Sequence, residues 1–140
     1  MANALRFLLL TFALVAWAPG ARAASPPVPF VMQMTEGDSD AQRRAFLQIA
    51  KVLEDIGPGK VKIEVVAYEG GITSLLANNN DTATLLAALA RNGVRFKAYR
   101  ISMRAHELKE DDFPLEVEFV PAGAVEMVRL QIQSYRYWRP

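Results

Sequence analysis

The chain contains no cysteine and a single histidine among its 140 residues. Without a thiol it can form no disulfide, carry no persulfide and offer no thiolate to a metal or a substrate. The one histidine, His106, has only scattered carboxylates near it in the sequence and makes a poor zinc site. Thiol chemistry is therefore excluded, and we expect neither a metal nor another cofactor.

A serine hydrolase is also disfavoured. Ser102 and His106 could share one helical face, but no carboxylate is placed to orient the histidine, and no nucleophile elbow surrounds the serine. We therefore expect no catalytic residue.

Long hydrophobic runs are missing outside the first residues. Arg6 precedes an uncharged apolar run over residues 7–18, and small residues occupy positions 21–23, as signal peptidases require. About 12 residues at ~1.5 Å each span only ~18 Å, too short for an uncleaved anchor across a ~30 Å hydrocarbon core. The sequence predicts a signal peptide over residues 1–23, cut between Ala23 and Ala24. The mature protein is then periplasmic or otherwise exported, without stable membrane insertion.

A strong charge of either sign is absent as well. The formal net charge is +1, and loss of residues 1–23 removes two arginines, so that 14 basic residues face 15 acidic ones. A nearly neutral domain offers no electrostatic surface for nucleic acid. We expect no nucleic-acid partner.

Between residues 24 and 140, strand-like and helix-like hydrophobic patterns alternate. Short apolar runs predict strands over 28–34, 61–67, 94–99 and 115–120, with a terminal strand at 137–138. Helical spacing predicts a helix that begins at Asp38 or Ser39 as N-cap and is stopped by the Gly57-Pro58-Gly59 segment. Further helical segments are predicted over 72–76, after Asp81 as N-cap, over 102–108, and over 125–135. Such alternation favours one domain, a three-layer α/β/α fold with a mostly parallel sheet of about five strands.

The expected apolar faces of two of these helices follow from the same spacing. The helix after Asp81 carries a stripe of Leu85, Leu86 and Leu89. The last helix carries its stripe at Val125, Val128, Ile132 and Tyr135.

Several segments carry a family resemblance. Residues 62–72 read KIEVVAYEGGI, residues 92–96 read NGVRF, and residues 117–126 read VEFVPAGAVE, followed by RLQ at 129–131 and YRYWRP at 135–140. Together they resemble the DsrE/DsrF-like family of sulfur-relay proteins over roughly the whole of residues 24–140. The resemblance implies a flavodoxin-like sheet and assembly into homotrimers or homohexamers.

One departure from the family pattern matters for chemistry. Many members carry a cysteine just after the third strand, in a context resembling A-C-x-N-T-M, where this chain reads AYRISM over residues 98–103. Tyr99 therefore occupies the thiol position. A phenol with a pKa near ~10 cannot accept a persulfide, so the family's sulfur transfer does not carry over. Glu69 and Gly70 also replace the glycine and proline of the family's loop.

The carboxyl ends of the predicted second and third strands supply the candidate site, because open α/β sheets bind ligands at that edge. Glycine N–H groups and arginines there would suit a small anion. The alternative is plain turn chemistry for the glycines, and arginines that are solvated or paired with Glu107 and Asp111. The candidate ligand-binding residues are Glu69, Gly70, Gly71, Tyr99, Arg100, Ser102 and Arg104.

Two functions remain open. The first is a non-catalytic envelope protein, a homo-oligomer that binds a small ligand or serves assembly, with the aromatic residues 135, 137 and 138 finishing the sheet or a subunit contact. The second is an accessory component of sulfur metabolism that acts with a cysteine-bearing partner. The missing thiol favours the first.

Overall fold

The computed structural model describes residues 24–140, so the predicted signal peptide lies outside the described residues. Eleven elements follow one another along the described chain. They are β1 (Val28–Met34), α1 (Ser39–Ile56), β2 (Val61–Ala67), the 3-10 helix η1 (Glu69–Leu75), α2 (Ala83–Arg91), β3 (Arg95–Tyr99), α3 (Arg100–Ala105), the 3-10 helix η2 (Glu110–Asp112), β4 (Val117–Val120), α4 (Gly123–Ile132) and β5 (Arg136–Trp138). None of the described helices is long and apolar enough to cross a membrane.

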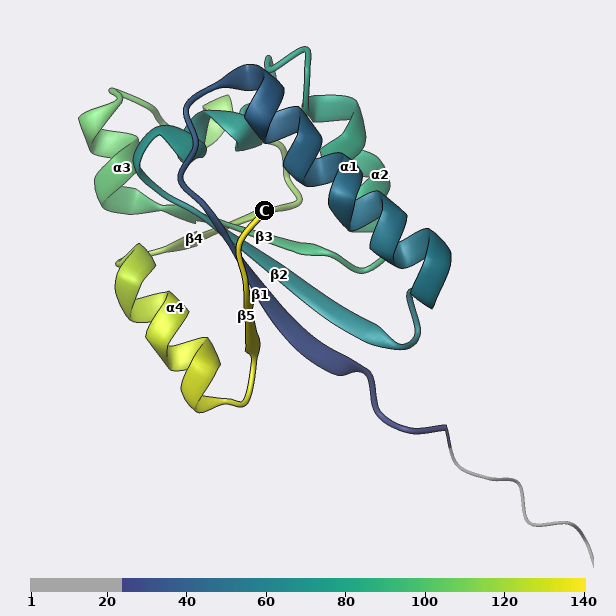
Figure 1. The fold of residues 1–140 in the computed structure, drawn as a ribbon. Coiled ribbons are helices and arrows are strands. Elements are labelled where there is room, and N and C mark those ends of the chain that lie inside the picture. Colours follow the sequence, from purple (N-terminus) through teal and green to yellow (C-terminus); the bar gives the residue numbers. More distant parts are fainter. Residues whose placement is uncertain (1–23) are drawn as a thin grey trace, which may run out of the picture.

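The five strands form one parallel sheet in the order β4-β3-β2-β1-β5. From β1 to β4 each strand joins the sheet beside its predecessor, and right-handed crossovers then place the intervening helices on one face. The last connection runs back across the sheet, so α4 covers the opposite face. Figure 1 shows α1 and α2 on one side of the sheet and α4 alone on the other. The predicted three-layer α/β/α fold is confirmed.

The two faces bury different kinds of core. The α1 and α2 face holds the larger apolar cluster, with Phe46 and Phe96 in ring contact at 5.4 Å between their centroids. The α4 face holds a smaller one. Its buried members are Val31, Val66, Met127, Leu130 and Tyr135.

Local signals explain where α1 begins and ends. The Asp38 carboxylate accepts a hydrogen bond from the Ala41 N–H and caps the first turn. Gly57 follows the last turn with φ +99°, and its N–H donates to the Leu53 carbonyl.

Two helical expectations need correction. Asp81 does not cap α2: the helix follows Thr82 without a side-chain cap, and the Asn79 side-chain oxygen instead accepts from the N–H groups of Asp81 and Thr82. The helix expected over 102–108 is α3, which begins at Arg100 and ends at Ala105. α3 follows β3 without an intervening loop, and Tyr99 at the N-cap position gives its first turn no side-chain hydrogen bond.

α4 does not bury the face that its hydrophobic pattern predicts. Val125, Val128 and Ile132, the stripe expected to face the core, are 64%, 55% and 80% exposed. The helix instead turns a face with Glu126 and Met127 towards the sheet. Tyr135 is buried, but it lies beyond the end of the helix.

Candidate functional site

The carboxyl ends of all five strands meet at one edge, because the sheet is parallel. The chain leaves β3 towards the α1 and α2 face, where Met103 of α3 packs into the larger core, and leaves β4 towards α4 on the other face. Neighbouring strands whose connections diverge in this way open a crevice between their carboxyl ends. The topology therefore places the candidate site between Tyr99, at the end of β3, and the residues after β4.

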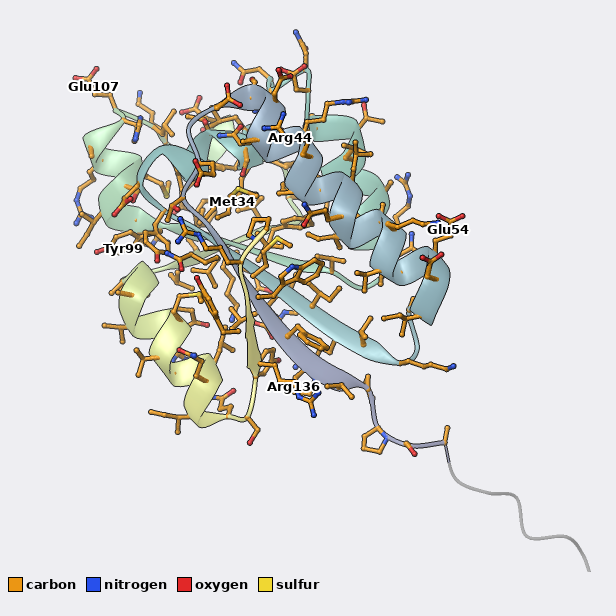
Figure 2. The ribbon with its side chains drawn as sticks, viewed as in Figure 1. Met34, Arg44, Glu54, Tyr99, Glu107 and Arg136 are labelled. Carbon is orange, nitrogen blue, oxygen red and sulfur yellow. The ribbon has the colours of Figure 1, made fainter. Side chains whose placement is uncertain are left out.

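Tyr99 and Tyr68 lie in contact at this edge of the sheet. Their rings meet edge to face with centroids 6.3 Å apart, and a Cβ added to Gly123 would lie 3.0 Å from the Tyr68 ring. Gly123 thus allows the start of α4 to sit directly on Tyr68. Figure 2 shows Tyr99 between α3 and the beginning of α4.

A row of polar groups continues from Tyr68 across the α4 face of the sheet. The Gln33 amide donates to the Tyr68 hydroxyl, and the Tyr137 hydroxyl donates to Gln33 Oε1 at 2.5 Å. Burial, with help from Glu69, raises the pKa of Tyr68. The phenol therefore stays protonated near neutral pH and can exchange hydrogen bonds but not act as a nucleophile.

The loop after β2 reaches this edge with its conformation fixed. Glu69 has a positive φ of 51°, and its N–H donates to the Ser102 hydroxyl at 2.8 Å. Ser102 is buried and used in this contact. The structure therefore brings Glu69 and Ser102, two of the candidate ligand-binding residues, into a contact that holds the loop.

Gly70 and Gly71 face another part of the molecule. A Cβ on Gly71 would lie 2.1 Å from the Met34 carbonyl oxygen, and one on Gly70 would lie 2.9 Å from the Gly37 Cα. These glycines let η1 pack against the chain that leaves β1. Close backbone packing accounts for both residues without a ligand.

The two arginines of the predicted site do not act together. Arg100 pairs with Glu110 and lies over the Phe119 ring, 5.3 Å from its centroid. Arg104 is exposed on the last turn of α3 and takes part in no ion pair among residues 24–140. Arg100 thus lies just beyond the end of β3 with its charge paired to Glu110.

Sequence reasoning missed Gln33, Tyr68 and Tyr137. Gln33 stands inside the apolar run of β1, and Tyr68 follows the buried run of β2. The signal was available in the period of two along each strand, which puts alternate residues on the same face. It was hidden at Gln33 because Met32 and Met34 flank it, and at Tyr68 because the following Glu69 and two glycines indicate a loop.

A second polar cluster lies between the sheet and α4. Glu64, 1% exposed, contacts Lys97 Nζ at 2.6 Å and Arg95 at 3.3 Å, and accepts a 2.6 Å hydrogen bond from the Tyr135 hydroxyl. Lys97 also pairs with the buried Glu126 of α4. The Glu64 Oε2 contact with Lys97 is an ion pair without hydrogen-bond geometry.

Charge compensation sets the protonation of this cluster. Burial opposes the charge of Glu64, but Lys97 and Tyr135 together hold its pKa below the ordinary value. Burial likewise opposes the charge of Lys97, and its two carboxylate partners hold its pKa above the ordinary value. Glu64 and Lys97 are therefore both charged near neutral pH, and Lys97 connects the sheet to α4 through its contact with Glu126.

No group of three or more histidine, aspartate or glutamate side chains in the described part of the chain could hold a metal ion. His106 is exposed just after α3. The chemistry that the described site offers is hydrogen bonding by phenols, an amide and backbone N–H groups at the start of α4.

Comparison with known proteins places these features in a family. A model described as the DsrE/DsrF-like family matches residues 28–139. Among solved structures, the chain is similar to MTH1491 from Methanobacterium thermoautotrophicum, described as a protein of unknown function, with 28% identity and a TM-score of 0.74. The match covers 81% of this chain and 99% of that one. No curated protein matches.

Proposed function

Because the chain belongs to the DsrE/DsrF-like family and has no cysteine, we propose that it is a non-catalytic envelope protein of that family. It works as a homo-oligomer and holds a small polar or anionic ligand at the carboxyl edge of its sheet. The observation that carries this proposal is Tyr99, which lies at the end of β3 at the position resembling the family's thiol.

The groups around Tyr99 support binding rather than catalysis. Tyr68 and Tyr99 offer hydroxyls, Arg100 lies at the start of α3 beside them in the chain, and the first turn of α4 has no side-chain cap. A helix N-terminus favours negative charge. None of these groups is a nucleophile at neutral pH, so the ligand is held and not transformed.

Native mass spectrometry of the protein purified from its own cells tests the proposal, since it reports copy number and retained small molecules together. We expect several copies and a retained molecule whose occupancy falls at least tenfold in Tyr68→Phe and in Arg100→Ala. Arg91→Ala is the matched control, an exposed arginine at the end of α2 near the opposite edge of the sheet. A ligand-free monomer contradicts the proposal, and equal retention in all three variants removes the crevice as its site.

The proposed location is the periplasm or another exported compartment. Its support is the pattern of residues 1–23, which has the charge, apolar run and small residues of a cleaved leader. The mass of the purified chain should correspond to a start at Ala24. A chain that retains residues 1–23 contradicts it.

A second function is favoured by the family match itself. In this alternative the protein is an accessory component of sulfur metabolism and supplies structure to a cysteine-bearing partner subunit. Affinity purification of the tagged protein from its own cells should then recover a thiol-containing relative in fixed proportion. Recovery of copies of this chain alone rejects the alternative.

A further inference from the structure

Three branched aliphatic side chains on the outer surface of α4 face solvent in the isolated domain. Val125, Val128 and Ile132 are each more than half exposed, and with Ala124 they line a shallow hollow along the helix. The helix packs onto the sheet through its other face, so these residues contribute to neither apolar core. Contiguous exposed aliphatics of this kind mark contact surfaces.

We propose that this stripe is covered by the α4 of a second copy, packed antiparallel about a two-fold axis that passes near Val128. The proposal rests on the homo-oligomer proposed above and names one of its contacts. It is not required for the ligand site.

The side-chain sizes along the stripe favour an antiparallel arrangement. Ala124, Val128 and Ile132 are four residues apart and form one ridge of the helix, the kind of ridge that packs into the groove of a second helix. Side-chain size increases from one end of this ridge to the other. A two-fold axis at Val128 sets the small Ala124 of each copy opposite the large Ile132 of the other, so the two ridges complement each other.

The charges around the stripe permit this contact. Arg129 beside the stripe already pairs with Glu126, which in turn pairs with Lys97. Burial of the stripe therefore leaves no charge of α4 unpaired. In the antiparallel arrangement the positive end of each helix dipole also lies beside the negative end of the other.

The size of the stripe limits how strongly two copies can associate through it alone. A stable specific complex usually employs about 20–30 residues on each side, whereas a ten-residue helix presents only one side to a partner. The α4 contact is therefore one of the contacts in a larger homo-oligomer. Its two-fold axis fits the hexamer that the family resemblance implies, as a contact between two trimers, because a closed trimer alone has no two-fold axis.

The absence of cysteine makes a direct test possible, because one introduced cysteine has no native thiol to compete with. Helix axes ~8–10 Å apart with Cα atoms ~2.3 Å from each axis bring facing Cα atoms to about 3–5 Å at the crossing, which overlaps the ~4.4–6.8 Å of a disulfide. Under mild oxidant, we expect Val128→Cys to form a covalent dimer with itself. Ala124→Cys mixed with Ile132→Cys should form the mixed dimer in preference to either self-dimer.

Two controls separate this contact from chance collision. Gln131→Cys is an exposed position on the flank of the same helix, and Leu115→Cys is a fully exposed apolar position before β4. Both should cross-link at least tenfold more slowly than Val128→Cys. Native mass spectrometry of the unmodified protein accompanies the series and reports its copy number.

The outcomes are distinguishable. A monomeric unmodified protein overturns both the proposed homo-oligomer and the α4 contact. A multi-copy protein whose Val128→Cys variant reacts no faster than the controls overturns the α4 contact alone. Self-dimers of Ala124→Cys and Ile132→Cys without the mixed dimer overturn the antiparallel arrangement. Binding to vesicles of neutral and anionic lipid that is lost in Val128→Lys, with copy number unchanged, assigns the stripe to a membrane surface and overturns the proposal.

Discussion

Lys97 is the residue on which the contact between sheet and α4 depends most. It lies between Glu64 of β2 and Glu126 of α4, and all three side chains are at least nine-tenths buried. Removing one member of a buried ion pair leaves an uncompensated charge and costs about 3–5 kcal/mol. We expect Lys97→Met to lower the free energy of unfolding by about that amount in urea titrations.

Lys51→Met provides the matched control. Lys51 pairs with Glu54 and Asp55, but its side chain is 63% exposed. Exposed pairs contribute about 0–1 kcal/mol. Equal losses in the two variants would show that the buried cluster does not hold α4, whereas partial recovery in Glu64→Leu combined with Lys97→Met would support it.

The same cluster predicts how stability depends on acid. The folded pKa of Glu64 lies below its ordinary value of 4.5, so the folded carboxyl binds its proton less readily than the unfolded one. Its contribution is fully present above pH 4.5 and is lost as the pH falls through the lower folded pKa. We expect the free energy of unfolding to decline over this acid range, and to decline less steeply in Glu64→Gln. Parallel slopes for the two proteins below pH 4.5 would contradict this assignment.

Residue composition could not have predicted this cluster. The run over residues 61–67 reads as a buried strand, and it is one, yet Glu64 lies within it. A charged residue in such a run looks like a solvent-facing position, as the exposed Lys62 in the same strand is. Its burial depends on Lys97 in β3 and Tyr135 beyond α4, partners 33 and 71 residues away in the chain, and no local pattern reveals such a contact.

At the scale of elements, the junction between β1 and η1 depends on Gly71. A Cβ at this position would lie 2.1 Å from the Met34 carbonyl oxygen, and neither backbone can yield without moving a strand or a turn. Such overpacking costs about 1–3 kcal/mol, and the backbone contact argues for the upper part of that range. We expect Gly71→Ala to lower the thermal unfolding midpoint clearly in calorimetry.

Gly59→Ala is the corresponding control in a turn. Nothing lies within 4 Å of a Cβ built on Gly59. This substitution should be neutral or slightly stabilising, because alanine restricts the unfolded chain. A neutral Gly71→Ala would mean that η1 shifts away from β1 without cost.

The bounds of a helix or strand could be predicted where the local sequence sets them. The orientation of a helix was predicted wrongly where a contact with a distant residue sets it. The bounds of β1 and β2 follow from their apolar runs, and α1 follows from Asp38, its spaced apolar residues and Gly57. The stripe of α4 was read towards the core because apolar spacing alone does not say which layer covers a helix. The Glu126 contact with Lys97 turns the opposite face inward.

For the candidate site, the sequence predicted which residues lie at the carboxyl edge of the sheet but not the neighbouring polar residues of β1 and β5. Tyr99, Ser102 and Glu69 lie at the carboxyl ends of β2 and β3, as expected from alternating strands and helices. Gln33 and Tyr137 join them because β5 returns to pair with β1. That pairing follows from the last crossover, which depends on how the whole chain folds rather than on any segment.

At the scale of the whole molecule, assembly of folded copies should make thermal stability depend on protein concentration. Association of folded copies stabilises them by mass action, and a tenfold rise in concentration adds about 1.4 kcal/mol per two-copy contact, or about 0.7 kcal/mol per copy. For a domain of this size we expect the unfolding midpoint to rise by about 2–4 °C per tenfold. Calorimetry or far-ultraviolet circular dichroism over two decades of concentration measures it.

The α4 stripe lies outside both apolar cores, so its loss should change assembly and not the fold. Val128→Lys is expected to keep the stability of the separate domain within about 0.5 kcal/mol, as surface substitutions usually do. It should also flatten the concentration dependence, because one contact of the homo-oligomer is removed. A midpoint of the unmodified protein that stays constant over the whole concentration range would rule out assembly of folded copies. A concentration dependence that Val128→Lys leaves unchanged would place that assembly on another surface.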